Sequence, residues 1–252
     1  MKFKTLFRLL LLIALMLLLN NVFGRAGGGS SGGGGSSGSG GGGYSGYGHS
    51  GSYSHSSTDG TFPIMMILLV VVILIVGCIV PALLKLKSYF STKIITHSSS
   101  KDSFWDGDQL KNHTEKTFRR MQRAWQERNM ELVKSHVTTE LYTEYKILLN
   151  EMKKRREKNM LSNINFTETR IIGCEDFKDD SKDRYTAYIK GTILDYIINE
   201  RIDVIIQNPQ KIIGDFTDTY HFVRMNNTWI LEKIDNTVTM QDIIQAKNYI
   251  EK

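Results

Sequence analysis

The chain has 252 residues and a formal net charge of +6, and 41% of its residues are hydrophobic. This length allows one or two compact domains, but seventeen of the 22 glycines lie between residues 24 and 60, so that only the remainder can bury a core. The two cysteines and six histidines show no zinc-ligand spacing, which argues against a structural metal site, and no cofactor is expected.

The first 60 residues are predicted to be a signal peptide and a tether. Lys2, Lys4 and Arg8 precede an uninterrupted apolar run over residues 9–19, which is the order of a secretory signal. We expect this signal peptide to cover residues 1–26, and an uncleaved anchor would give the same topology. Residues 27–60 contain no Leu, Ile, Val or Phe, so they cannot offset the entropy lost on ordering and form a disordered Gly/Ser/Tyr-rich segment.

Residues 61–86 are predicted to form one transmembrane helix. The stretch from Phe62 to Leu84 has no charged residue and would be about 34 Å long as a helix, which is sufficient to cross a bilayer. Lys85, Lys87 and Lys93 follow directly. The positive-inside rule therefore predicts a single-pass protein of the cell membrane with its C-terminal part in the cytoplasm.

The polar segment over residues 87–109 is predicted to be an irregular linker. Its large anchors Phe104 and Trp105 could insert at the level of the lipid headgroups or dock on the domain that follows. We expect this domain to cover residues 110–252.

Three helices are predicted at the start of the domain. Apolar residues recur at helical spacing over residues 109–128, and a short helix follows over residues 130–137. A third helix begins at the Thr138 cap and runs to the basic sequence KKRREK, which ends at Lys158. These helices carry one apolar stripe each, so they are expected to cover a sheet.

The pattern changes beyond Met160, where apolar and polar residues alternate. Short alternating runs are separated by the turn sequences DFKDDSKD, QNPQ and MNN, which suit hairpins of antiparallel strands. Helices followed by a run of strands predict an α+β domain with the helices on one face of the sheet.

Four motifs in this domain resemble one known family. In chain order they are Met121-Gln122-x-Ala124-Trp125, then Glu140-Leu141-Tyr142, then Phe216-Thr217-Asp218-x-Tyr220-x-Phe222-Val223-Arg224, and finally Trp229-x-Leu231-x-x-Ile234. Together they are similar to the C-terminal domain of the mitochondrial inner-membrane import translocase subunit 44 and its bacterial relatives, over roughly residues 105–240.

The resemblance implies a nuclear-transport-factor-two-like cone, in which helices pack on a curved sheet around an apolar pocket. Trp125, Tyr220, Phe222 and Trp229 would line that pocket if it is open, and they would otherwise be core residues. Tyr220 stands where the family usually has Trp, but an aromatic ring that fills the core would preserve the fold.

A basic cluster points to a role at a membrane. Residues 110–160 carry thirteen Lys and Arg against seven Asp and Glu, and the densest group is Lys153, Lys154, Arg155, Arg156 and Lys158. Such a group could contact anionic lipid, or it could simply complement the dipole at the end of a helix. A nucleic-acid partner is not expected, because no aromatic stacking platform is interleaved with the basic residues.

The sequence therefore predicts a non-enzymatic, membrane-anchored scaffold or binding domain that contacts an unknown protein partner, anionic lipid or both. The alternative is an isomerase, a dehydratase or a carrier of the same cone fold, because some proteins of this fold place polar side chains in the apolar pocket. Candidates for such a site are Asp195 as the base and a tyrosine, Tyr185 or Tyr196, as the hydrogen-bond donor, together with His221, although nothing in the sequence shows that these residues converge.

Overall fold

The structure is a computed structural model that describes residues 61–251, with side chains from Gly77 onward. The predicted signal peptide (1–26) and the Gly/Ser/Tyr-rich segment (27–60) lie outside the described residues. Among the side chains that are described, no helix has an apolar stretch long enough to cross a membrane. The chain divides into two compact units, and the larger one contains residues Leu83–Lys252.

Helix α2 (Thr61–Ser98) extends further than the sequence predicts. The linker expected over residues 87–109 is helical to Ser98, so the prediction of an irregular chain there is wrong for its first half. The reason is that Ile94 and Ile95 are both buried on the domain, which stabilises the helix beyond its apolar part. Trp105, in the turn that follows, is fully buried and docks on the domain.

Three helices form the next layer, as predicted. They are α3 (Gly107–Gln126), the 3₁₀ helix η1 (Met130–His136) and α4 (Thr139–Lys154). The side chains of Asp106, Asn129 and Thr138 cap their first turns by accepting backbone hydrogen bonds. Helix α4 ends at Lys154, earlier than predicted, because Arg156 adopts a positive φ of 59° and the chain enters a strand at the next residue.

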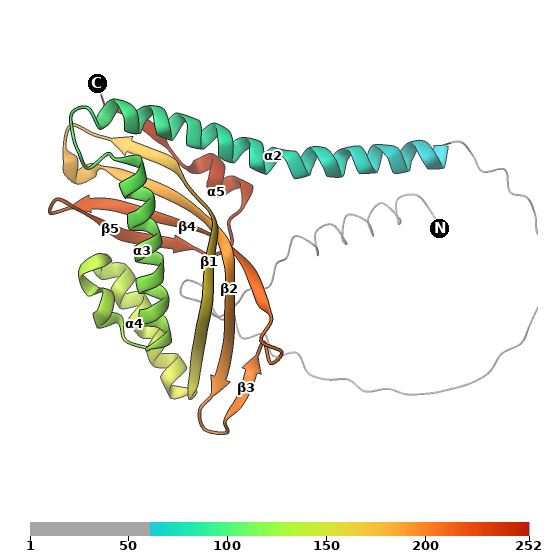
Figure 1. Ribbon diagram of the computed structural model, residues 1–252, viewed down its shortest axis with the longest axis vertical. Helices are drawn as coiled ribbons and strands as arrows, with labels where there is room; N and C mark the ends of the chain where they lie inside the picture. Colours follow the sequence, from blue (N-terminus) through green and yellow to red (C-terminus); the bar gives the residue numbers. More distant parts are fainter. Residues whose placement is uncertain (1–60, 252) are drawn as a thin grey trace, which may run out of the picture. The chain divides into compact units, whose positions relative to one another are not determined.

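The sheet has six strands in the order β5-β4-β2-β1-β6, with β3 paired to β2. The strands are β1 (Glu157–Asp176), β2 (Arg184–Asn199), β3 (Val204–Gln207), β4 (Ile213–Met225), β5 (Thr228–Asp235) and β6 (Asn248–Ile250). Three register shifts interrupt the pairing of β1 with β2, and such bulges bend a strand and increase its twist. The sheet therefore curls strongly, and α3 and α4 lie on its concave side (Figure 1).

One glycine shows how tightly the curled strands approach each other. A Cβ atom at Gly191 of β2 would lie 2.3 Å from the carbonyl oxygen of Asn165 and 2.9 Å from the ring of Phe216. Residue 191 sits opposite Phe166 and Phe216 in the two neighbouring strands. A side chain is thus excluded at this position, and the backbone of β1 occupies the space.

The core lies between the helices and the concave face of the sheet. Phe118 of α3 stacks on Phe216 at 4.9 Å between ring centroids, and Tyr185 stacks on Phe222 at 4.4 Å. Tyr220 is fully buried, so this ring fills the core at the position where the resembling family usually has Trp. The predicted α+β class, with helices on one face of a curved sheet, is confirmed.

The chain ends with two short elements that the sequence pattern does not reveal. They are helix α5 (Met240–Gln245), which has a capping box formed by Thr239 and Asp242, and strand β6, which pairs in parallel with the end of β1. Neither is long enough to show a period, and the parallel pairing joins residues more than 70 positions apart.

Candidate functional site

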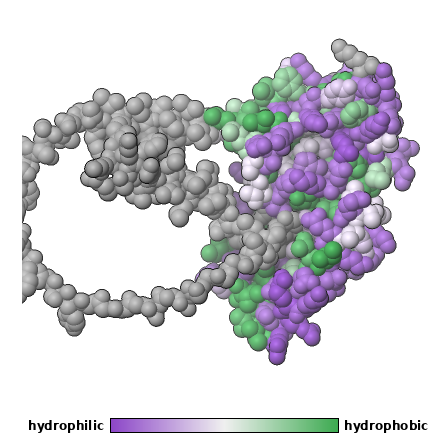
Figure 2. All heavy atoms as spheres, turned by 180° about the vertical axis from the view of Figure 1, so that it is seen from behind, coloured by the Kyte–Doolittle hydropathy of each residue, from purple (hydrophilic) through white to green (hydrophobic). Residues whose placement is uncertain are grey.

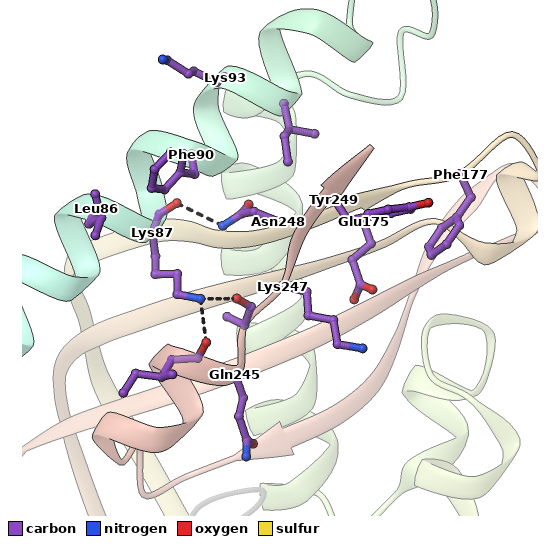
Figure 3. Close-up of a pocket in the computed structure, with 13 residues that line it drawn as sticks. Leu86, Lys87, Phe90, Lys93, Glu175, Phe177, Gln245, Lys247, Asn248 and Tyr249 are labelled. Atoms are coloured by element: carbon purple, nitrogen blue, oxygen red, sulfur yellow. Dashed lines mark hydrogen bonds between the residues drawn. The ribbon is translucent and has the colours of Figure 1, made fainter. Parts of the chain in front are cut away.

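One candidate site is a groove between the C-terminal part of α2 and the segment that contains α5 and β6. It has a volume of about 860 Å³. Its lining is Leu86, Lys87, Phe90, Lys93, Ile94, Glu175, Phe177, Ile244, Gln245, Ala246, Lys247, Asn248 and Tyr249. Figure 3 shows Leu86 and Phe90 on α2 and, across the groove, Tyr249 and Phe177.

Hydrogen bonds from α2 hold this helix against the segment that contains α5 and β6. The Lys87 ammonium donates to the carbonyl oxygens of Ile244 and Ala246, each at 2.6 Å, where α5 ends. These carbonyls have no partner within the helix, so the cation also complements the negative end of the helix dipole. Partial burial lowers the pKa of Lys87. Ser91 donates to the side-chain oxygen of Asn248 at 2.8 Å and thereby ties α2 to β6.

The groove combines an apolar surface with charges at its edge. Leu86, Phe90, Ile244 and Tyr249 are between 46% and 51% exposed, which is high for large apolar side chains that lie close together. A surface of this composition can hold an extended apolar segment of another molecule. No sequence motif indicates the groove, because six of its 13 lining residues belong to the C-terminal segment with α5 and β6, which the pattern missed.

The predicted basic cluster lies at the junction of α4 and β1. Lys154 pairs with Glu151 at 2.7 Å, and Arg155 pairs with Glu157 at 2.9 Å, so two of its five cations are partly neutralised. No ion pair is described for Lys153, Arg156 or Lys158 within residues 77–251. The cluster spans a helix end and a strand start, and its exposed cations are available to an anionic surface.

The four aromatic residues predicted to line a pocket lie in the packed core. Trp125, Tyr220, Phe222 and Trp229 are at most 6% exposed. Trp229 meets the ring of Trp105 edge-to-face at 5.1 Å. Because the rings pack on one another and on α3, these four residues contribute to stability, as expected for the alternative in which they are core residues.

The structure does not bring the four candidate catalytic residues together. Tyr185 and Asp195 both face the concave side of β2, but ten residues of a strand separate them by roughly 33 Å. Tyr196 points to the opposite face, and so does His221, which pairs with Thr186 across the strands. They therefore cannot act on one substrate atom.

Asp195 is buried, and it lies on an interior strand of the sheet. Strand β2 has β1 on one side and β3 and β4 on the other. The Asn159 side chain, which is fully buried, donates to a carboxylate oxygen of Asp195 at 2.7 Å. His221 has a separate partner, because its ring nitrogen Nε2 lies 2.9 Å from Asp235. Burial opposes ionisation of Asp235, but hydrogen bonds from His221 and Lys233 outweigh burial and lower its pKa to about 2.

Two buried polar contacts were not predicted from the sequence. The ring nitrogen Nδ1 of His113 lies 2.9 Å from the Tyr185 hydroxyl, and burial, together with the charge of Arg120, lowers the pKa of His113 to about 4. Arg224 forms ion pairs with Asp102, with Asp180 at 3.1 Å and with Asp183 at 3.2 Å. Those three carboxylates come close enough to share a cation, and the Arg224 guanidinium is the cation among them.

The fold thus defines a class: an α+β domain in which helices cover the concave face of a strongly curled sheet. The model of the family described as "Tim44-like domain" matches residues 91–236, and the chain belongs to this family. The match begins within α2, in agreement with the packing of that helix on the domain. A comparison with curated proteins gave no match. Among solved structures, the crystal structure of the intermembrane space region of chloroplast protein ARC6 is similar with a TM-score of 0.36 and 9% identity, over 53% of this chain and 98% of that chain.

Proposed function

We propose that this chain is a non-enzymatic binding domain anchored in the cell membrane, with the Tim44-like domain on the cytoplasmic side. The observation that carries the proposal is the continuity of α2. Its first part contains the uncharged stretch from Phe62 to Leu84, and its part from Leu83 onward belongs to the compact unit of the domain. The same helix thus contains the proposed membrane span and one wall of the groove.

The charges next to the uncharged stretch support the proposed orientation. Lys85, Lys87 and Lys93 follow it within the next three turns of the helix, and cations in this position retain the flanking chain in the cytoplasm. Lys93 lies over the ring of Tyr89 at 4.6 Å. Aromatic rings with nearby lysines are typical of the interface between lipid and water.

Two surfaces serve binding in this proposal. The exposed cations at the α4–β1 junction contact anionic lipid headgroups, each with a contribution on the order of 1 kcal/mol. The groove beside α2 accepts an extended apolar segment of a partner protein, because its walls are apolar and it borders β6, the last strand of the sheet order. No chemical step is assigned to either surface.

The anchor and the orientation can be tested together in cells. The full chain should remain in the membrane pellet after an alkaline carbonate wash, whereas a variant without residues 62–84 should be released. A reporter enzyme that is active only in the cytoplasm should be active when it is fused after Lys252. Release of the full chain by carbonate, or activity of the reporter only outside the cytoplasm, would refute the proposal.

A further inference from the structure

A short hairpin at one end of the sheet exposes an unusual number of aliphatic side chains. We call residues 200–213, which include β3, the β3 hairpin. Five of its residues are between 48% and 64% exposed: Ile202, Val204, Ile206, Ile212 and Ile213. Figure 1 shows β3 beside the end of β2 that is opposite to α5, and Figure 2 shows apolar side chains along an edge of an otherwise mostly hydrophilic face.

This aliphatic surface is presented by a well-formed loop. The Asn208 side chain donates to the carbonyl oxygens of Asp195 and Ile212, both at 2.8 Å, and accepts a hydrogen bond from the Ile212 N–H at 2.9 Å. Strand β3 pairs with β2 on the other side of the loop. Since these bonds hold the backbone, the exposure of Ile212 and its neighbours is a property of the folded state, and a group of large exposed apolar side chains on one element marks an interaction site.

Cations surround the aliphatic side chains. Arg201 and Lys211 belong to the hairpin itself, and a depression of about 310 Å³ joins it to the basic cluster. The residues that line this depression are Lys154, Arg156, Glu200 and Arg201. Glu200 is already engaged, because the guanidinium of Arg128 contacts both of its carboxylate oxygens at 2.9 Å. Asp203 is an exposed anion of the hairpin, but Arg201, Lys211 and the adjacent Arg156 outnumber it, so positive charge is in excess around the hairpin.

We propose that the β3 hairpin inserts its aliphatic side chains into the interfacial layer of an anionic bilayer, with Arg156 and Arg201 at the level of the headgroups. Apolar side chains that enter the acyl boundary while adjacent cations contact acidic lipid are the two components of interfacial binding. This inference rests on the proposed function, since it names the element through which the basic cluster engages lipid.

The charges favour a lipid surface over a second copy of the chain. In a symmetric dimer the same patch meets itself, so that two surfaces with the same net positive charge would be brought together. Such an arrangement is repulsive. An anionic bilayer offers charges of the opposite sign next to an apolar layer, which matches the composition of the hairpin.

The test places a nitroxide spin label on the full chain reconstituted in vesicles. Cys78 is replaced by Ser, which leaves only the buried Cys174, and the label is attached at Ile206→Cys or at Met225→Cys. Ile206 and Met225 are both 48% exposed, but Met225 is the last residue of β4, at the end of that strand away from the hairpin, so it is a matched control. Collisions with oxygen and with a water-soluble nickel complex report the depth of the label.

In vesicles of phosphatidylglycerol and phosphatidylcholine, the Ile206 label should lose most of its collisions with nickel, while the Met225 label should keep them. Vesicles of phosphatidylcholine alone should leave both labels in water, and R156Q with R201Q should return the Ile206 label to water. If the Ile206 label in acidic vesicles collides with nickel as often as the Met225 label, the inference is wrong. Equal protection of the Ile206 label from nickel in acidic vesicles, neutral vesicles and detergent would also overturn the inference. It would indicate contact with a second copy of the chain, because such a contact does not depend on lipid.

A third label separates this inference from the proposed function. Lys153→Cys places the nitroxide in the basic cluster, next to the hairpin but outside it. If this label reports the headgroup layer in acidic vesicles while the Ile206 label stays in water, lipid contact stands and insertion of the hairpin is refuted. If both labels stay in water, lipid contact by the cluster and insertion fail together.

Discussion

The ammonium group of Lys87 lies 2.6 Å from the carbonyl oxygen of Ala246, although 159 positions separate the two residues in the chain. This hydrogen bond joins α2 to the C-terminal segment and closes one side of the groove. Helix α2 is therefore a structural part of the Tim44-like domain from about Leu83 onward, and removing it would change the domain as well as its attachment.

Lys87→Met should loosen the C-terminal segment. The variant keeps the apolar stem of the side chain but loses the donor, at a cost of about 1 kcal/mol, which corresponds to roughly a fivefold loss of amide protection in α5 and β6. Native-state hydrogen exchange measures this effect. Lys85→Met is the control, because Lys85 is an exposed lysine on the same helix. Equal exchange in both variants would show that the contact does not hold the segment.

Trp229→Ala should destabilise the domain by about 3 to 5 kcal/mol, because the indole is 6% exposed and packs on Trp105 and Tyr185. Urea unfolding of the fragment Leu83–Lys252 measures the change. Met225→Ala, at an exposed position of the preceding strand, should change the unfolding free energy by less than about 0.5 kcal/mol. A midpoint for Trp229→Ala close to that of the control would contradict the burial described for this ring.

Gly191→Ala should be destabilising by about 1 to 3 kcal/mol, since its methyl group would overlap the Asn165 carbonyl and the Phe216 ring. Gly107→Ala is the matched control, because the nearest atom to a Cβ there is a methyl group of Ile95 at 3.7 Å. Thermal unfolding of both variants measures the difference in their stability. If the two substitutions were equally tolerated, the close approach of β1 and β2 would be wrong.

Stability should fall as the pH is lowered from about 6.5 towards 4, in part because of His113. Burial lowers its pKa in the folded protein to about 4, from an ordinary value of 6.5. Between these values the unfolded chain binds the extra proton, so acidification favours unfolding, by about 2 kcal/mol after allowance for partial exposure. The Asp183 carboxyl has the opposite effect on stability, because burial raises its pKa to about 6 in the folded protein. Below this pH the folded protein binds the proton more readily than the unfolded chain, so acidification favours folding.

Comparison with His113→Gln isolates the contribution of the histidine. The difference in unfolding free energy between the parent and this variant should change with pH over the range from 6.5 to 4, and it should be constant above pH 7. A difference that does not depend on pH would mean that His113 titrates alike in the folded and unfolded states.

The sequence is sufficient to predict those elements whose signals are local. The Thr138 cap and the helix spacing of Leu141 and Tyr145 determine the start and the buried face of α4. Two of the turn sequences, DFKDDSKD and MNN, join strands that pair with each other, β1 with β2 and β4 with β5. These features do not depend on residues far away in the chain. The hairpin predicted at QNPQ is wrong, because this turn joins β3 to β4 and both of these strands pair with β2.

Features that depend on distant contacts could not be predicted in this way. The sequence allowed two environments for Trp105, the lipid headgroups or the domain. It could not decide between them, because the partner ring of Trp229 lies 124 positions further along the chain. Whether the aromatic residues surround a cavity or fill it depends on how closely α3 approaches the curled sheet. Similarly, the groove exists because α2 meets a C-terminal helix and strand that are too short to show a pattern.

If the domain itself engages anionic lipid, the fragment Leu83–Lys252 should bind acidic vesicles without the proposed membrane span, and vesicle sedimentation measures this binding. This fragment begins where the compact unit begins and lacks most of the uncharged stretch. It should sediment with acidic vesicles, and binding should decrease as salt shortens the Debye length from about 10 Å at 0.1 M to about 3 Å at 1 M. Neutral vesicles should not bind it.

Replacing Lys153, Lys154, Arg155 and Arg156 by Gln should weaken this binding at least about tenfold, or about 1.4 kcal/mol. A control that removes the same formal charge from the sheet half, with Gln at Lys178, Lys182, Lys190 and Lys233, should bind nearly as well as the parent. If the parent fragment ignores acidic vesicles, or if the two quadruple variants bind equally, the basic cluster is only a solvated helix end and the account is contradicted.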